Sequence, residues 1–122
     1  AQRLGYDVDK NVFFVDFEGL AIRSRDDIEH VRQAVDSHLA PLGHKVYAVV
    51  NYDRFSIAPE LVDEYTAMVK GIVDRHYHDV TRYTSSTFLR MKIGEALARS
   101  EVPPHMYGSA SEAQSHLGAA LP

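Results

Sequence analysis

The sequence of 122 residues contains no cysteine and no tryptophan. Without cysteine there is no disulfide framework, no thiol nucleophile and no thiolate metal site, and the composition predicts a reducing, cytoplasmic location. No apolar run approaches the roughly 20 residues needed to cross a bilayer, so we expect no membrane partner. A net charge of −4 also disfavours nucleic acid as a partner, because nucleic acids recruit basic surfaces.

The residues that are present are those of an ordinary globular domain. Hydrophobic residues make up 45% of the chain and charged residues 25%. A chain of this length can bury about two thirds of the surface that its unfolded form exposes, which is enough for a core without covalent crosslinks. We therefore expect residues 1–122 to form a single domain.

Five segments favour β-structure because they are short and rich in β-branched or aromatic residues. They are Gln2–Tyr6, Val12–Phe17, Val46–Tyr52, Asp79–Thr84 and His105–Tyr107. Turn-forming residues between the first two segments predict a hairpin. The third segment is almost continuously apolar, which is typical of a strand covered on both faces in a parallel sheet. Leu20–Ile22 is expected to extend the second strand or to begin the link to the next helix.

Four segments have the apolar spacing of amphipathic helices. The first follows Ser24, a predicted N-cap, and the second begins near Pro59, which suits a first helical turn. The N-cap candidates of the third and fourth helices are Ser85, Ser86 or Thr87, and Ser109 or Ser111. The predicted core stripe of the third helix consists of Phe88, Leu89, Ile93, Ala96 and Leu97.

These elements follow the order β-β-α-β-α-β-α-β-α, which predicts an α/β fold with a mixed, mostly parallel sheet covered by helices. The order, together with the segment Ser109–Leu117, resembles the STAS domain, the fold of anti-sigma-factor antagonists, in its SpoIIAA-like branch. In STAS regulators a phosphorylated Ser or Thr follows the central strand, in an Asp-Ser-Ser/Thr-Gly type of sequence. Here Asp53 matches that pattern, Ser56 is offset, and the hydroxyl pair and the glycine are missing. The resemblance implies the hypothesis of a phospho-switch at Ser56.

Two polar segments are expected at the carboxyl ends of parallel strands, where open α/β sheets bind ligands. One is Asp53–Ser56. The other is Thr84–Thr87, whose hydroxyl and backbone N–H groups, with Arg82 and Arg90, have the chemistry to hold a phosphate or carboxylate. Helix capping by the same hydroxyls is the competing interpretation. The predicted ligand- or partner-binding surface consists of Asp53, Arg54, Phe55, Ser56, Arg82, Thr84, Ser85 and Ser86.

Neither a metal site nor a catalytic site is predicted. His76 and His78 lie close together between Asp74 and Asp79, but a zinc site needs further ligands at recognisable separations. Glu18 precedes a glycine, yet no spacing pairs it with another carboxylate as acid and base. We assign no catalytic residue, no metal ligand and no cofactor to this chain.

Several tracts are similar to the C-terminal extension of bacterial acyl-CoA:acetate/3-ketoacid CoA-transferases. They are Asn11–Leu20, Lys45–Ile57 with Pro59–Tyr65, and Val80–Leu97. The resemblance implies that the chain is the excised C-terminal part of a longer protein, which transfers coenzyme A between short-chain carboxylic acids such as acetate and acetoacetate. It also implies that the catalytic glutamate and the Gly-rich loops belong to the preceding domains. Coenzyme A is then a substrate of the parent protein and not a cofactor of this domain.

The preferred interpretation is a non-catalytic accessory domain that supports assembly or binds a regulatory ligand. Its partners are the preceding CoA-transferase catalytic domains of the same chain. The alternative is a stand-alone STAS-like module that switches a protein partner through the predicted binding surface. A homodimer through Phe55 or through an exposed sheet edge is compatible with both interpretations.

Overall fold

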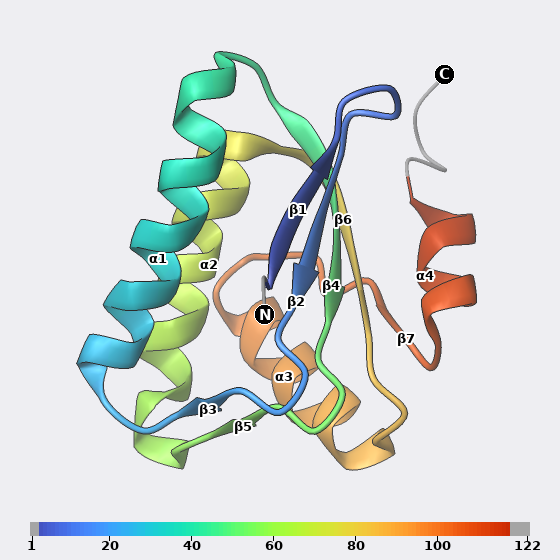
Figure 1. The fold of residues 1–122 in the computed structure, drawn as a ribbon. Coiled ribbons are helices and arrows are strands. Elements are labelled where there is room, and N and C mark those ends of the chain that lie inside the picture. Colours follow the sequence, from blue (N-terminus) through green and yellow to red (C-terminus); the bar gives the residue numbers. More distant parts are fainter. Residues whose placement is uncertain (1–2, 118–122) are drawn as a thin grey trace.

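The computed structural model describes residues 3–117, and its centre is a five-stranded sheet (Figure 1). The strand order is β1-β2-β4-β6-β7, and within the sheet only the β1–β2 pair is antiparallel. The strands are β1 (Leu4–Asp7), β2 (Val12–Asp16), β4 (Val46–Asn51), β6 (Tyr77–Tyr83) and β7 (Met106–Tyr107). The prediction of an α/β fold with a mixed, mostly parallel sheet is confirmed. Gln2, the predicted start of the first strand, lies outside the described residues.

Four α-helices cover this sheet. They are α1 (Arg25–Leu39), α2 (Val62–His76), α3 (Thr87–Arg99) and α4 (Ala110–His116). Helices α1, α2 and α3 pack on one face, and α4 packs on the other (Figure 1). Short 3-10 turns, Ala40–Leu42 and Pro59–Leu61, follow α1 and precede α2. Within residues 3–117, no helix combines the length and the apolar character needed to span a membrane.

Serine side chains determine where three of the helices begin. The hydroxyl oxygens of Ser24, Ser86 and Ser109 accept hydrogen bonds from the backbone N–H three residues further on, at 3.3, 3.1 and 3.2 Å. Each bond satisfies one of the N–H groups that a helix start leaves without a partner. The structure therefore uses Ser86 among the three candidates before α3, and Ser109 rather than Ser111 before α4.

The core has two layers because side chains alternate across the strands. On the side of α1, α2 and α3, Phe13, Val46 and Ala48 are fully buried. On the other side, Val12 and Val49 pack against Ala113 of α4. The strand β4 is thus buried on both faces, as its apolar run predicted.

A second sheet of two short parallel strands was not predicted. It consists of β3 (Ala21–Ile22) and β5 (Ser56–Ile57). Gly19 ends the preceding strand with a φ of +72°, a conformation that glycine adopts without steric cost. The chain then turns away from β2, so Ala21–Ile22 pairs with β5 instead of extending β2.

The structure corrects the predicted core stripe of α3. Leu89, Ile93 and Leu97 are buried as expected, but 73% of the Phe88 surface is exposed. Phe88 and Leu89 are adjacent in sequence, so they project about 100° apart around the helix axis. Because Leu89 faces the sheet, the Phe88 ring lies outside the stripe and reaches the solvent.

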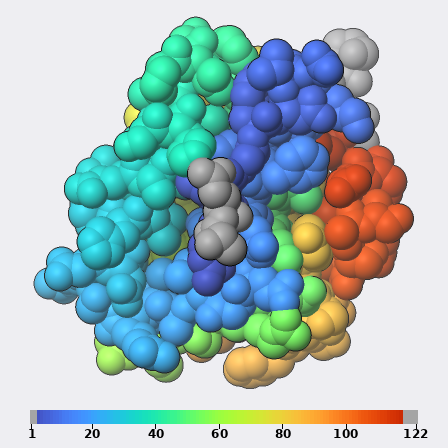
Figure 2. Space-filling view, viewed as in Figure 1, coloured from blue at the N-terminus to red at the C-terminus, as the bar shows by residue number. Residues whose placement is uncertain are grey.

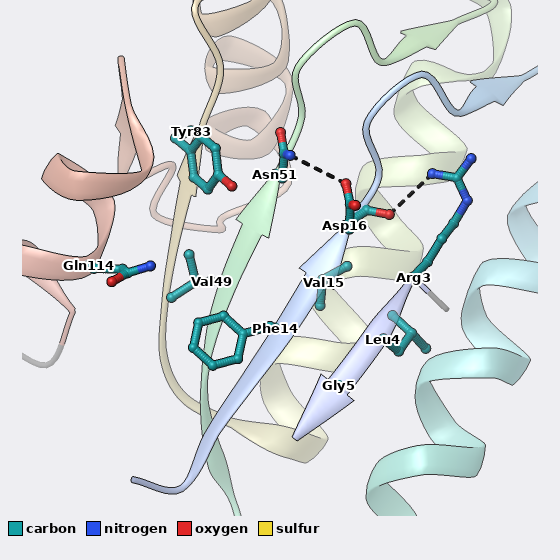
Figure 3. Close-up of a pocket in the computed structure, with 10 residues that line it drawn as sticks. All are labelled: Arg3, Leu4, Gly5, Phe14, Val15, Asp16, Val49, Asn51, Tyr83 and Gln114. Atoms are coloured by element: carbon teal, nitrogen blue, oxygen red, sulfur yellow. Dashed lines mark hydrogen bonds between the residues drawn. The ribbon is translucent and has the colours of Figure 1, made fainter. Parts of the chain in front are cut away.

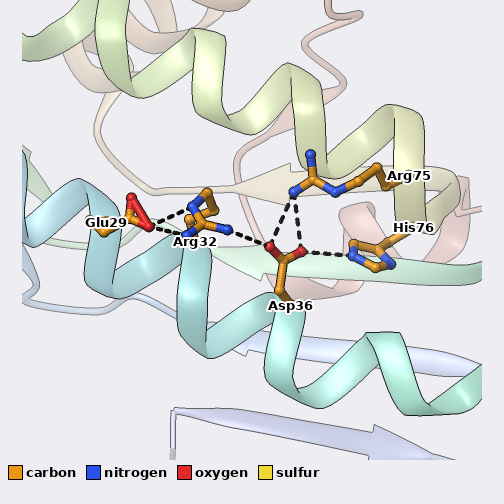
Figure 4. A network of polar contacts seen from close by, with 5 residues as sticks. All are labelled: Glu29, Arg32, Asp36, Arg75 and His76. Atoms are coloured by element: carbon orange, nitrogen blue, oxygen red, sulfur yellow. Dashed lines mark hydrogen bonds and ion pairs between the residues drawn. The ribbon is translucent and has the colours of Figure 1, made fainter.

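A polar network joins α1 to the end of α2 (Figure 4). Asp36 is its centre: Arg32 Nη1 donates to Asp36 Oδ2 at 2.9 Å, and Arg75 Nη2 donates to Oδ1 at 3.1 Å. His76 Nε2 lies 2.8 Å from Oδ1, and Arg32 also pairs with Glu29. Burial raises the pKa of the Asp36 carboxyl, but the hydrogen bonds and charges of His76 and Arg75 outweigh this effect and leave the pKa below its usual value.

We expect Asp36→Asn to lower the free energy of unfolding at neutral pH by about 1 kcal/mol, since the network is partly solvated. The folded-state pKa of Asp36 is below the unfolded-state value of about 4, so the stabilising charge is present above that value and is lost as the pH falls through the folded-state pKa. Urea unfolding measured at neutral pH and in acid should therefore show a difference that shrinks in acid. Asp9→Asn, in an exposed turn, is the control and should change little. A difference that grows in acid would contradict the assignment.

Candidate functional site

The polar side chains at the last residues of β2 and β4 and in the turns after β2, β4 and β6 form one connected group at the carboxyl ends of these parallel strands. We call this group the carboxyl edge, defined by Asp16, Glu18, Asn51, Asp53, Arg54 and Ser85. The side-chain amide of Asn51 is central: Nδ2 lies 3.3 Å from both Asp16 Oδ1 and Glu18 Oε1. Its Oδ1 accepts a hydrogen bond from the Asp53 backbone N–H at 2.8 Å. Asn51 therefore fixes the turn after β4 relative to the end of β2.

Asp53 connects the turn after β4 to the turn after β6. Its Oδ1 accepts hydrogen bonds from the Ser85 backbone N–H at 2.7 Å and from the Ser85 hydroxyl at 3.1 Å. Its backbone carbonyl accepts a hydrogen bond from the Gly19 N–H at 3.0 Å. Asp53 thus holds together the turns that follow three neighbouring strands.

These contacts bear on the predicted anion site at Thr84–Thr87. The Ser85 donors are used by the carboxylate of Asp53, and the Ser86 hydroxyl caps α3. Arg90 Nη1 donates to the Thr84 carbonyl at 2.6 Å. In the structure the Ser85 donors therefore bind a carboxylate of the same chain, that of Asp53. The Ser86 hydroxyl acts as a helix cap, in agreement with the competing interpretation.

Arg54 and Ser56 are exposed members of the predicted surface, as are Ser85 and Ser86. Arg54 has a φ of +56°, which is uncommon for a residue with a Cβ atom. In this conformation its guanidinium pairs with Glu18, so the turn after β4 again contacts the turn after β2. Ser56 lies in β5, and its backbone N–H donates to the Leu20 carbonyl at 3.0 Å.

The structure buries three members of the predicted surface. Phe55, Arg82 and Thr84 are only 4%, 1% and 0% exposed. The Phe55 ring packs edge-on against the Tyr52 ring, with centroids 4.9 Å apart. This corrects the expectation that Phe55 is an exposed dimer contact, because its ring is part of the core. Arg82 likewise projects into the core rather than toward Ser85.

A depression of about 330 Å³ lies beside the carboxyl edge, on the face of the sheet that carries α4 (Figure 3). Phe14, Val49 and Tyr83 form part of its floor, and Gln114 of α4 lies at one side. Phe14, in β2, remains 39% exposed because α4 packs mainly against β6 and β7 (Figures 1 and 2). Burial raises the pKa of Tyr83, and the negative charges of Asp16 and Asp53 raise it further, so the hydroxyl stays protonated at neutral pH.

The histidine cluster that was considered for metal binding is dispersed. His76 bonds to Asp36, whereas the His78 ring packs against Tyr47 with centroids 5.5 Å apart. His105 Nδ1 lies 3.5 Å from Asp79. Among residues 3–117, no group of three or more histidine or carboxylate side chains is arranged to hold a metal ion.

Sequence reasoning missed an apolar surface on α3, which we call the α3 patch and define as Phe88 and Met91. These side chains are 73% and 61% exposed. Depressions of about 360 and 260 Å³ flank Phe88, one on the side of α2 and the other on the side of Arg54 and Ser56. The spacing of three residues between Phe88 and Met91 was a signal for a second apolar stripe, separate from the buried one.

The chain matches no family model, no curated protein and no solved structure.

We predict that Asp53→Ala lowers the free energy of unfolding by about 1–3 kcal/mol, because it leaves the Ser85 donors without their carboxylate partner. The matched control is Asp63→Ala. The Asp63 side chain is 86% exposed and has one long contact, 3.4 Å to Arg99, so its loss should cost well under about 1 kcal/mol. Urea unfolding monitored by circular dichroism measures both changes. Equal effects of the two substitutions would show that the Asp53 link does not stabilise the fold.

Proposed function

We propose that this chain is a non-catalytic, partner-binding accessory domain of a bacterial acyl-CoA:acetate/3-ketoacid CoA-transferase. The observation that carries the proposal is the α3 patch, in which an aromatic ring and a thioether side chain are both mostly exposed. Large exposed apolar side chains that lie together mark interaction surfaces in soluble proteins. The parent enzyme is inferred from the resemblance of the tracts described above.

The surroundings of the α3 patch favour a protein as the occupant. Lys92 Nζ lies 6.0 Å from the centroid of the Phe88 ring, and Glu95 and Arg99 line the same depression. An apolar centre with charged residues of both signs around it is the usual anatomy of a protein interface. Aromatic residues and methionine are also enriched in such interfaces.

The partner that we propose is the pair of catalytic domains that precede this domain in the same polypeptide. Two exposed apolar side chains form a small patch, and a small patch gives weak binding between separate molecules. A covalent connection raises the effective concentration to the millimolar range, so a weak contact of this size suffices within one chain. The domain needs no cofactor in this role, and coenzyme A binds to the catalytic domains in the cytoplasm.

We assign the fold to the STAS-like, SpoIIAA-like type as part of this proposal. The assignment is supported by the strand order β1-β2-β4-β6-β7 with an antiparallel first pair. It is also supported by the helices that follow β4, β6 and β7. A stand-alone STAS-like module is the second candidate. One observation favours it: Ser56 is exposed and lines the same depression as Arg54 and Lys92, whose charges suit a phosphoserine. Phosphoserine at Ser56 in mass spectra of the native protein would support the second candidate.

We expect the double substitution Phe88→Ser and Met91→Ser to weaken the contact with the catalytic domains by about 10-fold or more, since both side chains are proposed to be buried there. The measurement is sedimentation and limited proteolysis of the protein encoded by the full open reading frame. In the variant, the domain should no longer pack against the catalytic domains, although it stays joined to them in one polypeptide. The matched control is Val8→Ser, because Val8 is 75% exposed but lies in the β1–β2 turn.

Two outcomes would contradict the proposal. One is an open reading frame that encodes no CoA-transferase domains before this segment. The other is a double variant that behaves like the Val8 control in every assay. CoA-transferase activity and oligomeric state of the parent are then compared with and without residues 1–122. Loss of the oligomer indicates an assembly role, whereas loss of regulation with the oligomer intact indicates a regulatory role.

A further inference from the structure

Gly5 leaves open space at the depression beside the carboxyl edge. It lies in β1 directly opposite Phe14 of β2, in an uninterrupted register. Its φ is outside the left-handed region, so the backbone does not require glycine there. Packing does not require it either, because a Cβ atom at Gly5 would have no atom of the described residues within 4 Å, its chain neighbours aside. Glycine weakens a strand, and within one it often marks a place where a ligand approaches closely.

The ring of Phe14 does not cover this glycine. An aromatic ring often packs over a glycine on the neighbouring strand. Here the ring points toward Val49 and away from Gly5 (Figure 3), and 39% of the Phe14 surface is exposed. Phe14 and Gly5 thus line an open depression of about 330 Å³, which is within the range of about 300–1,000 Å³ that is usual for small-molecule sites.

Two carboxylates give this depression a negative potential. Neither Asp16 nor Asp53 forms an ion pair with another of the described residues, and both accept hydrogen bonds from neutral groups. The pKa of Tyr83 is raised first by burial and then by these two negative charges, so both charges act on its hydroxyl.

Arg3 also lines the depression, but its hydrogen bonds hold it at one end. Its Nη1 donates to the backbone carbonyl oxygens of Asp16 and Glu18 at 3.2 and 2.9 Å. The guanidinium lies beyond Asp16, on the side away from Tyr83 and Phe14 (Figure 3). The part of the depression between Asp16 and Tyr83 therefore combines negative charge with aromatic rings.

We propose that this depression binds a small primary amine in its protonated form, with an aromatic or aliphatic body. The ammonium group lies between the Asp16 carboxylate and the Tyr83 hydroxyl oxygen. The body of the ligand lies over Phe14, in the space that Gly5 leaves open. This inference does not depend on the proposed docking role of the α3 patch.

The chemistry of the lining favours an organic cation over other ligands. An ammonium group donates charge-assisted hydrogen bonds to a carboxylate, and a cation beside the face of an aromatic ring is attracted by the ring. An anion would be repelled by Asp16 and Asp53. The site does not suit a metal ion, since no group of three or more histidine or carboxylate side chains among residues 3–117 is arranged to hold one.

Titration of the protein with benzylamine, followed by ¹H–¹⁵N NMR at neutral pH and constant ionic strength, tests the proposal. Benzyl alcohol and benzoate are the ligand controls, because they keep the ring and replace the ammonium by a neutral or a negative group. We expect saturable shifts of the backbone amides around Phe14 with benzylamine. Benzyl alcohol should bind about 10-fold more weakly or worse, and benzoate should give no saturable shift.

Two variants and a matched control test the location of the site. Gly5→Val fills the open space with a side chain that suits a strand, so it should weaken benzylamine binding by about 10-fold or more without lowering the Tm. Asp16→Asn keeps an oxygen for the Glu18 N–H but removes the charge, and should weaken binding by about 10-fold. The control is Val8→Ser, in the exposed β1–β2 turn, which should leave the affinity unchanged within about twofold.

Three results would overturn the proposal. The first is the absence of a saturable shift with benzylamine. The second is equal binding of benzyl alcohol or benzoate. The third is an affinity of either Gly5→Val or Asp16→Asn that equals the affinity of the Val8→Ser control.

Discussion

The central strand β4 constrains the rest of the structure, because it pairs with parallel strands on both sides and must be covered on both faces. Its neighbours β2 and β6 run in the same direction, so the chain has to cross over the sheet each time through a helix. The crossover helices α1 and α2 lie on one face, and α4 supplies the cover on the other. The same parallel arrangement brings the carboxyl ends of three strands together, and this is the origin of the polar carboxyl edge.

Most of the chemistry at that edge stabilises the fold. Asn51 and Asp53 bind backbone and side-chain groups of the neighbouring turns, with Ser85 donating to Asp53, and the Ser86 hydroxyl caps α3. In contrast, two features are not explained by the internal contacts of the domain. They are the apolar surface of α3 and the unpaired Nε of Arg82.

The sequence was sufficient to predict an α/β fold with a mixed, mostly parallel sheet covered by helices, because each long element has a strong periodic signal. The apolar run of β4 and the serine caps are local features, and their interpretation needs no tertiary information. The pairing of β3 with β5 was not predictable, since two residues are too few to show any periodicity. The candidate site was predicted only in part. Arg82 reads as a surface cation in sequence, and only the alternation along β6, which also buries Val80, places it in the core. Phe88 was assigned to the wrong face because its neighbour Leu89 satisfies the same spacing.

The short outer strands have a consequence for how copies of this domain meet. The sheet ends at β1 on one side and β7 on the other, which have four and two residues. An unpaired strand edge is a template for adding the strand of another molecule, and proteins limit this risk by keeping such edges brief. Here an added strand would gain only a few backbone hydrogen bonds at either edge. The short edges therefore limit the number of backbone hydrogen bonds that open-ended growth into fibrils could use.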